Sequence, residues 1–191
     1  MNTPAALLLC LFCLPGMARA GVFNLATFTC DSYENQILNA APTDKSEDAV
    51  NFTMWLFGYT VGHVGDHSIY SKGLQSFGNA LEVDCKSRPS ASLLDALGTV
   101  NPANESPMDL KELDCVTFEN RNAELAKADA DSARTIRMWL FGFSVGKAHG
   151  TVFDTEGLDD FDKVLKKQCG LRGQRSLFDA LSAIRIPKKY Q

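Results

Sequence analysis

Residues 54–62 read Met-Trp-Leu-Phe-Gly-Tyr-Thr-Val-Gly, and residues 138–146 read Met-Trp-Leu-Phe-Gly-Phe-Ser-Val-Gly, 84 positions later. The register then continues without a gap, and 18 of the 44 pairs aligned from the first methionine onward are identical. Upstream, Cys30 corresponds to Cys115 at an offset of 85. The sequence therefore contains a duplication, and each cysteine, aromatic residue and glycine has to be interpreted together with its copy.

The N-terminus has the features of an export signal. Residues 4–16 form an uncharged, leucine-rich run, and the small-x-small sequence Ala18-Arg19-Ala20 follows it. The run is too short to span a membrane but has the length of a secretory signal core, although no Lys or Arg precedes it. We expect a signal peptide over residues 1–20 and a soluble product in the periplasm, because no other apolar run could cross a bilayer.

The charge balance argues against two classes of partner. Without residues 1–20 the chain has 18 basic and 23 acidic residues, a net charge of −5. A surface of this sign does not attract nucleic acid or anionic lipid. The expected partners are therefore other proteins.

Four cysteines remain after signal cleavage, and an even number in an exported protein indicates disulfides. Four cysteines allow three connectivities, of which the duplication selects one bridge per repeat, Cys30–Cys85 and Cys115–Cys169. In the chain-entropy model each such bridge stabilises the fold by roughly 4 kcal/mol. No two of these cysteines are close enough in sequence for a tetra-cysteine metal site.

The exported chain divides into two units, residues 21–103 and 104–191, joined by a short loop containing Pro and Asn. Apolar residues recur with a helical period in each unit, and period-two alternation is scarce. The pattern predicts an all-α fold with about four helices per repeat. The first helix starts at Cys30 or Cys115, the second contains the repeated block, the third ends at Cys85 or Cys169, and the fourth covers residues 92–97 or 176–181.

The repeated block also contains matched glycines and aromatic residues. Each glycine within a helix costs about 1 kcal/mol relative to alanine, so we expect a neighbouring helix to approach closely at this face; a bend or early helix end at the second glycine of each pair is the alternative. We interpret the aromatic residues as core, with a protein-binding surface as the alternative. The glycines are Gly58, Gly62, Gly142 and Gly146, and the aromatic residues are Trp55, Phe57, Tyr59, Trp139, Phe141 and Phe143.

No catalytic fingerprint occurs in the sequence. The acidic residues matched between repeats, such as Glu34 with Glu119, are explained as charges near helix N-termini. His63 and His67 are spaced for a shared helical face, but their copies are Lys147 and Thr151, and no further ligand completes a site. We therefore expect no enzymatic activity, no metal and no cofactor.

The order of these elements resembles the HdeA/HdeB family of small, exported, helical bacterial proteins with one internal disulfide. The resemblance rests on the first cysteine, the aromatic-Gly-aromatic helix, the second cysteine and the short Ser/Leu-rich helix, all present twice. It implies two tandem HdeA-like repeats and an acid-stress chaperone that prevents aggregation of unfolded periplasmic clients. Family members usually have one unit and associate as dimers, so the tandem implies an intramolecular pseudo-dimer.

The charge balance is compatible with an acid-responsive chaperone. Protonation of all 23 carboxylates would leave 18 Lys and Arg residues and three His, a charge of +21 before the termini are counted. Self-repulsion of that size loosens a small fold. Other interpretations stay open. Exported immunity proteins, which inhibit one specific partner such as a type VI secretion amidase effector, have a similar layout, and an envelope-assembly module is a third possibility.

Overall fold

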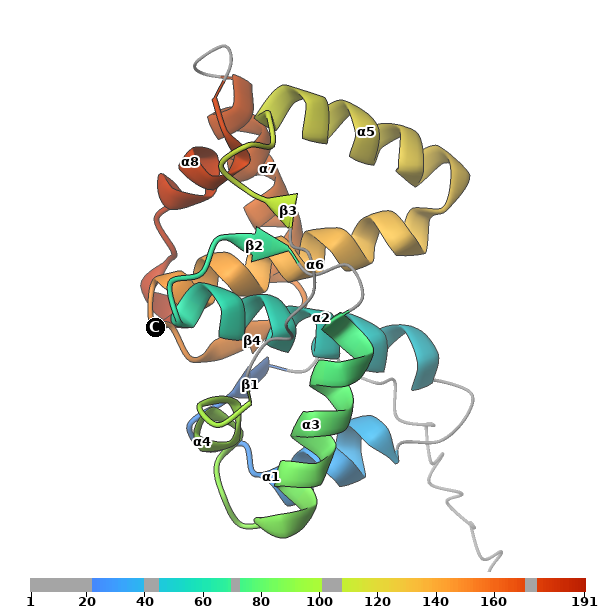
Figure 1. Cartoon of the computed structure of the whole chain (residues 1–191), viewed down its shortest axis with the longest axis vertical. Helices are drawn as coiled ribbons and strands as arrows, with labels where there is room; N and C mark the ends of the chain where they lie inside the picture. Colours follow the sequence, from blue (N-terminus) through green and yellow to red (C-terminus); the bar gives the residue numbers. More distant parts are fainter. Residues whose placement is uncertain (1–21, 40–44, 70–72, 101–107, 171–174) are drawn as a thin grey trace, which may run out of the picture.

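A computed structural model describes residues 22–39, 45–69, 73–100, 108–170 and 175–191, and these contain eight α-helices and four short strands (Figure 1). The predicted all-α class is correct for the helices, but the strands were not predicted. The expected signal peptide, residues 1–20, and the boundary between residues 103 and 104 lie outside the described residues. In the described part of the chain, no helix is long and apolar enough to cross a membrane.

The helices follow the same order in both halves of the chain. The first half contains α1 (Cys30–Tyr33), the π-helical segment η1 (Glu34–Leu38), α2 (Lys45–His63), α3 (Gly73–Ser87) and α4 (Leu93–Leu97). The second half contains α5 (Cys115–Ala128), α6 (Ala130–Lys147), α7 (Gly157–Gly170), α8 (Leu177–Ser182) and the short 3-10 helix η2 (Lys188–Tyr190).

The strands connect the two halves. β1 (Val22–Asn24) pairs antiparallel with β4 (Val152–Asp154), and β2 (Ser68–Ile69) pairs antiparallel with β3 (Met108–Asp109). In both cases the segment that precedes the first helix of one half pairs with the segment that follows the central helix of the other. Strands of two or three residues are too short to produce a period-two signal, which is why the sequence did not predict them.

Side-chain caps begin the short fourth helices, α4 and α8. Ser92 accepts a hydrogen bond from the Asp95 amide at 3.1 Å, and Ser176 accepts one from the Asp179 amide at 3.1 Å. Such a cap satisfies a backbone donor that the first turn of a helix leaves without a partner.

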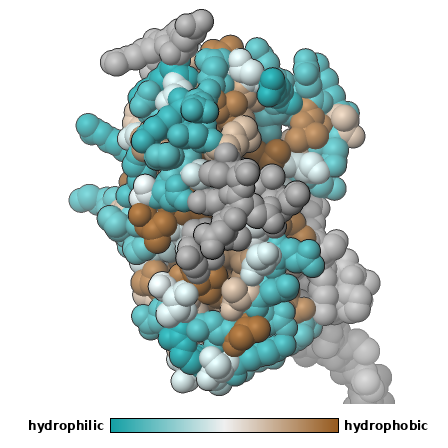
Figure 2. Space-filling view, in the orientation of Figure 1, coloured by the Kyte–Doolittle hydropathy of each residue, from teal (hydrophilic) through white to brown (hydrophobic). Residues whose placement is uncertain are grey.

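The helices α2 and α6 lie side by side at the centre of the molecule and make its most extensive contact (Figure 1). Helices α1, α3 and α4 lie on one side of this pair, and α5, α7 and α8 lie on the other. Figure 2 shows a mainly hydrophilic face with small, separate hydrophobic areas. Most large apolar side chains are buried in one continuous core, and the exposed ones, such as Val83 and Met108, are scattered.

Candidate functional site

The four matched glycines lie where α2 and α6 cross. A Cβ added at Gly58 would lie 2.8 Å from the carbonyl carbon of Trp139, and one added at Gly142 would lie 2.8 Å from that of Trp55. Gly62 and Gly146 face the carbonyls of Phe143 and Tyr59 in the same way, with the carbonyl carbon at 2.9 Å in both cases. The two backbones are therefore in direct contact, and only glycine fits at these positions.

The two central helices run parallel, both from right to left in Figure 1. Gly58 faces Trp139 and Gly62 faces Phe143, so the contact advances in the same direction along both helices. At the N-terminal end of the crossing, Thr135 Oγ1 donates a hydrogen bond of 3.1 Å to Asn51 Oδ1. Positions 51 and 135 are copies of each other, so the helices meet in register.

All six aromatic residues of the repeated block are buried, and none is more than 3% exposed. Trp55 stacks on Tyr59 with ring centroids 5.4 Å apart, and Trp139 stacks on Phe143 at 5.5 Å. Each tryptophan also makes a T-shaped contact with a ring of the other helix, Trp55 with Phe141 and Trp139 with Phe57. The block is therefore core in this state of the protein, and none of these six side chains is available to a partner.

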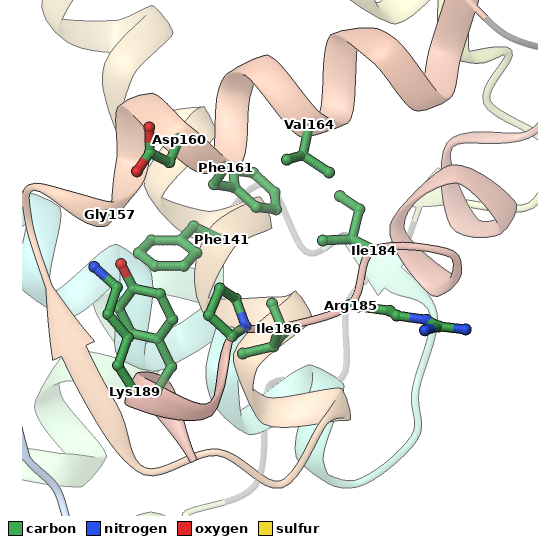
Figure 3. A pocket seen from close by; sticks show the side chains of 11 residues that line it. Phe141, Gly157, Asp160, Phe161, Val164, Ile184, Arg185, Ile186 and Lys189 are labelled. Carbon is green, nitrogen blue, oxygen red and sulfur yellow. The ribbon is translucent and has the colours of Figure 1, made fainter.

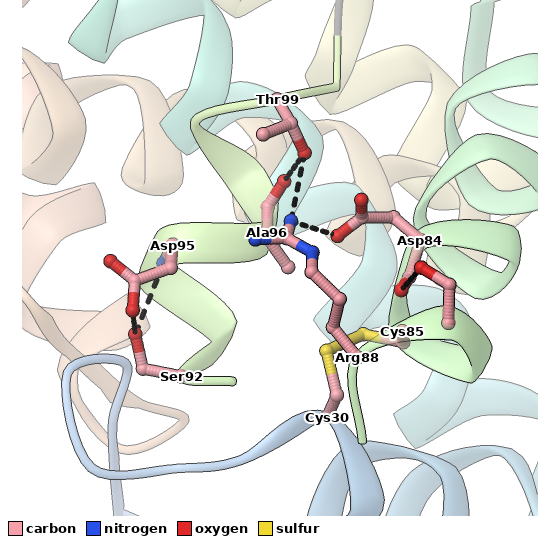
Figure 4. Close-up of polar contacts among 9 residues, drawn as sticks. Cys30, Asp84, Cys85, Arg88, Ser92, Asp95, Ala96 and Thr99 are labelled. Carbon is pink, nitrogen blue, oxygen red and sulfur yellow. Dashed lines mark hydrogen bonds and ion pairs between the residues drawn. A yellow bond between two sulfur atoms is a disulfide. The ribbon is translucent and has the colours of Figure 1, made fainter. Parts of the chain in front are cut away.

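The disulfides join Cys30 to Cys85 and Cys115 to Cys169, the pairing that the duplication selected. The first connects α1 to α3 and the second connects α5 to α7. Figure 4 shows the first bridge beside Arg88, which contacts the Asp84 carboxylate and donates to Thr99 Oγ1 at 3.2 Å. Each bridge lies within its own half of the chain, so neither joins the two halves or links α2 to α6.

A groove with many charged side chains lies between α5, α6 and α7. Comparison of the two repeats with each other did not predict it. Arg137 is only 5% exposed, and its guanidinium makes two hydrogen bonds to the Glu119 carboxylate, at 2.6 and 2.7 Å. Asp162 Oδ1 is 3.6 Å from Arg137 Nε. The copies of Arg137 and Asp162 in the first half are Thr53 and Gly78, so this ion cluster is present only in the second half.

A second cavity lies beneath the C-terminal segment, and its lining is mainly apolar (Figure 3). Phe141, Phe161, Ile186 and Tyr190 surround a space of roughly 80 Å³. Cavities that enclose a small-molecule ligand are several times larger, typically about 300–1,000 Å³. This one has room for no more than a small side chain or a few waters.

The three histidines occupy two different places. His67 Nδ1 lies 3.1 Å from Asp109 Oδ1. His63, the last residue of α2, instead lies beside His149, and their Nδ1 atoms are 3.4 Å apart. The structure therefore separates the two histidines that share a helical spacing and brings together two that are 86 residues apart. Within the described residues, no cluster of three or more His, Cys, Asp or Glu could hold a metal.

Several ionisable groups are shifted by their surroundings. Hydrogen bonds from the Thr117 side chain and amide lower the pKa of Asp114, the N-cap of α5. Hydrogen bonds from the Ser132 side chain and amide likewise lower the pKa of Asp129, the N-cap of α6. Burial raises the pKa of Asp162 against the opposing effect of Arg137. The folded state therefore favours the charged form of Asp114 and Asp129 and the neutral form of Asp162.

Comparisons with protein-family models, with curated proteins and with solved structures find no match to this chain. The features of the molecule that bear on its function are therefore the α2–α6 interface, the disulfides and the ionisable groups.

Proposed function

We propose that this protein is an exported, HdeA-like acid-stress chaperone that binds unfolded proteins through the apolar faces of α2 and α6. The observation that carries the proposal is the burial of the repeated aromatic block. A chaperone of this kind needs a large apolar surface that is hidden under ordinary conditions. The six aromatic side chains of α2 and α6 are hidden by the contact between these helices together with α3 and α7, against which Phe57 and Phe141 pack.

The cross-links favour opening at this interface. Each disulfide holds the first and third helices of one half together, whereas the two halves are joined by the chain itself, by α2–α6 packing and by two short sheets. Loss of the non-covalent contacts would therefore separate the halves while each kept its cross-linked framework. In this proposal the two halves are tandem HdeA-like repeats that pair as an intramolecular pseudo-dimer.

Acid supplies the trigger in this proposal. Asp114 and Asp129 have pKa values lowered by folding, so each stabilises the fold above its unfolded pKa of about 3.9 and loses that effect as pH falls through its folded pKa. Protonation also removes negative charge, and the remaining positive charges repel one another. Asp162 acts in the opposite direction, because its raised pKa means that the folded state binds its proton more readily.

The test is suppression of client aggregation by the chain without residues 1–20, at pH 2–3 and at pH 7, with exposed apolar surface followed by dye binding. An unrelated acidic protein of similar size is the necessary control, because any such protein undergoes a comparable charge change. We expect suppression and dye binding only at low pH. If the protein does not suppress client aggregation at low pH, the proposed chaperone function is wrong.

Inhibition of one specific partner is the second candidate function, and the groove between α5, α6 and α7 favours it. Exposed charged side chains line this groove, among them Arg134, Asp159 and Lys166. A partner with complementary charges would fit such a surface. This function predicts a stable one-to-one complex at pH 7 that substitutions in the groove abolish, and it predicts no dependence on acid.

A further inference from the structure

The ends of the two central helices bring His63 and His149 together. Their Nδ1 atoms are 3.4 Å apart, and the imidazole rings are nearly perpendicular, at 86°. Both side chains are exposed, so solvent ions can reach them. Lys147, the nearest cation in the sequence, directs its ammonium group toward Phe178 and Ser182 instead.

The separation of the two nitrogens suits a metal ion. Histidine nitrogens bind Zn²⁺ at about 2.0–2.1 Å in tetrahedral sites. An ion at that distance from both Nδ1 atoms would form an N–metal–N angle of about 112°, given their separation of 3.4 Å. This angle is close to the tetrahedral value, so the separation of the two nitrogens matches that of two ligands of one tetrahedral ion.

His149 occupies a strained position that its copy avoids. Its φ is 54°, in the left-handed region, whereas the copy in the first half is Gly65 with φ 76°. Both residues follow a helix C-cap, where glycine is the usual choice because a Cβ costs free energy in this conformation. Unusual backbone conformations retained at such a cost point to a function of the side chain.

The helix ends add a favourable field. Because α2 and α6 run parallel, their C-terminal ends lie together, and each carries partial negative charge on its last carbonyl groups. His63 is the last residue of α2, and His149 follows the C-cap of α6. A cation between the two imidazoles is therefore stabilised by both ends.

We propose that His63 and His149 form a two-histidine site for a divalent transition-metal ion, with Zn²⁺ preferred by its tetrahedral geometry. No third His, Cys, Asp or Glu joins them among the described residues, so water completes the coordination. The ion joins α2 to α6 and stabilises their contact. The site is independent of the chaperone proposal, since it requires no client and no opening of the interface.

Calorimetric titration of the full chain with ZnCl₂ at pH 7 tests the site. We expect one Zn²⁺ per chain, and at least tenfold weaker binding for His63→Gln and for His149→Asn, in which asparagine tolerates the left-handed backbone. The matched control is His67→Gln, which should bind Zn²⁺ like the unmodified chain. Equal binding by His149→Asn and the unmodified chain, or loss of binding in His67→Gln alone, would overturn the proposal.

Thermal unfolding supplies a second measurement that separates the metal from the fold. Zn²⁺ should raise the melting temperature of the unmodified chain and of His67→Gln, because the ion binds the folded state only. His149→Gly should melt higher than the unmodified chain without metal, because it removes the strain, yet gain nothing from Zn²⁺. A His149→Gly variant that Zn²⁺ stabilises as strongly as it does the unmodified chain would contradict the site.

Discussion

Substitution of Gly58 by alanine tests the close contact between α2 and α6. The added Cβ would lie 2.8 Å from the Trp139 carbonyl carbon and 3.0 Å from the Phe143 amide nitrogen. Carbon atoms in good contact are about 3.5–4.0 Å apart, so the helices would have to separate by roughly 1 Å. The obstacle is backbone, and therefore no change of side-chain rotamer can relieve it.

The expected cost follows from two opposing effects. Overpacking a core typically costs about 1–3 kcal/mol and occasionally more, whereas replacing a helical glycine by alanine returns about 1 kcal/mol. Because rigid backbone lies on both sides of this clash, we expect an overpacking cost of about 3 kcal/mol or more. The free energy of unfolding should therefore fall by about 2 kcal/mol or more in Gly58→Ala.

Urea unfolding followed by tryptophan fluorescence measures this change, since Trp55 and Trp139 both lie in the interface. Gly78→Ala in α3 is the matched control, because the nearest atom to its added Cβ is Thr53 Cγ2 at an ordinary 3.8 Å. It should be neutral or stabilising by up to about 1 kcal/mol. If Gly58→Ala proved as stable as Gly78→Ala, the proposed backbone contact would be refuted.

Three further substitutions test other parts of the structure. Thr29 caps α1 by accepting a hydrogen bond from the Ser32 amide, so Asp114→Thr should retain a cap on α5 at pH 7. It should shift the acid unfolding midpoint to lower pH, and an unchanged midpoint would exclude this cap from the acid response. Arg137→Met should destabilise the fold by about 3–5 kcal/mol, because it leaves the Glu119 carboxylate unpaired, and adding Glu119→Gln should restore part of that loss in thermal unfolding. Replacement of Cys115 and Cys169 by alanine should cost about 4 kcal/mol in urea unfolding, and a loss below 1 kcal/mol would contradict a constraining role.

The duplication made much of the scaffold predictable. Residues that are matched between the copies, such as Gly58 with Gly142 and Cys30 with Cys115, proved to be the close contact and the cross-links. Matched residues reveal what both halves need for packing. The comparison therefore predicted the helices, the disulfides and the helix contact, but it could not show that the contact joins the two halves.

The same comparison concealed residues that only one half contains. Arg137 and Asp162 correspond to Thr53 and Gly78, and His149 corresponds to Gly65. A rule that considers only matched residues excludes these three. Arg137 and Asp162 nevertheless form the ion cluster with Glu119, and His149 forms the histidine pair with His63. A spacing rule along one helix could not have paired His63 with His149 either, because their contact depends on the parallel arrangement of α2 and α6.

In the proposed chaperone, α2 and α6 must separate before clients can bind. Asn51 and Thr135 touch across the interface, with their side-chain oxygens 3.1 Å apart, so we choose these two positions for a cysteine pair and verify the new bond between the helices by peptide mapping. The single variant Asn51→Cys is the control, and peptide mapping establishes that the native disulfides are retained. At pH 2–3 we expect the locked double variant to lose most suppression of client aggregation while the single variant keeps it. Equal suppression by both variants would contradict the account.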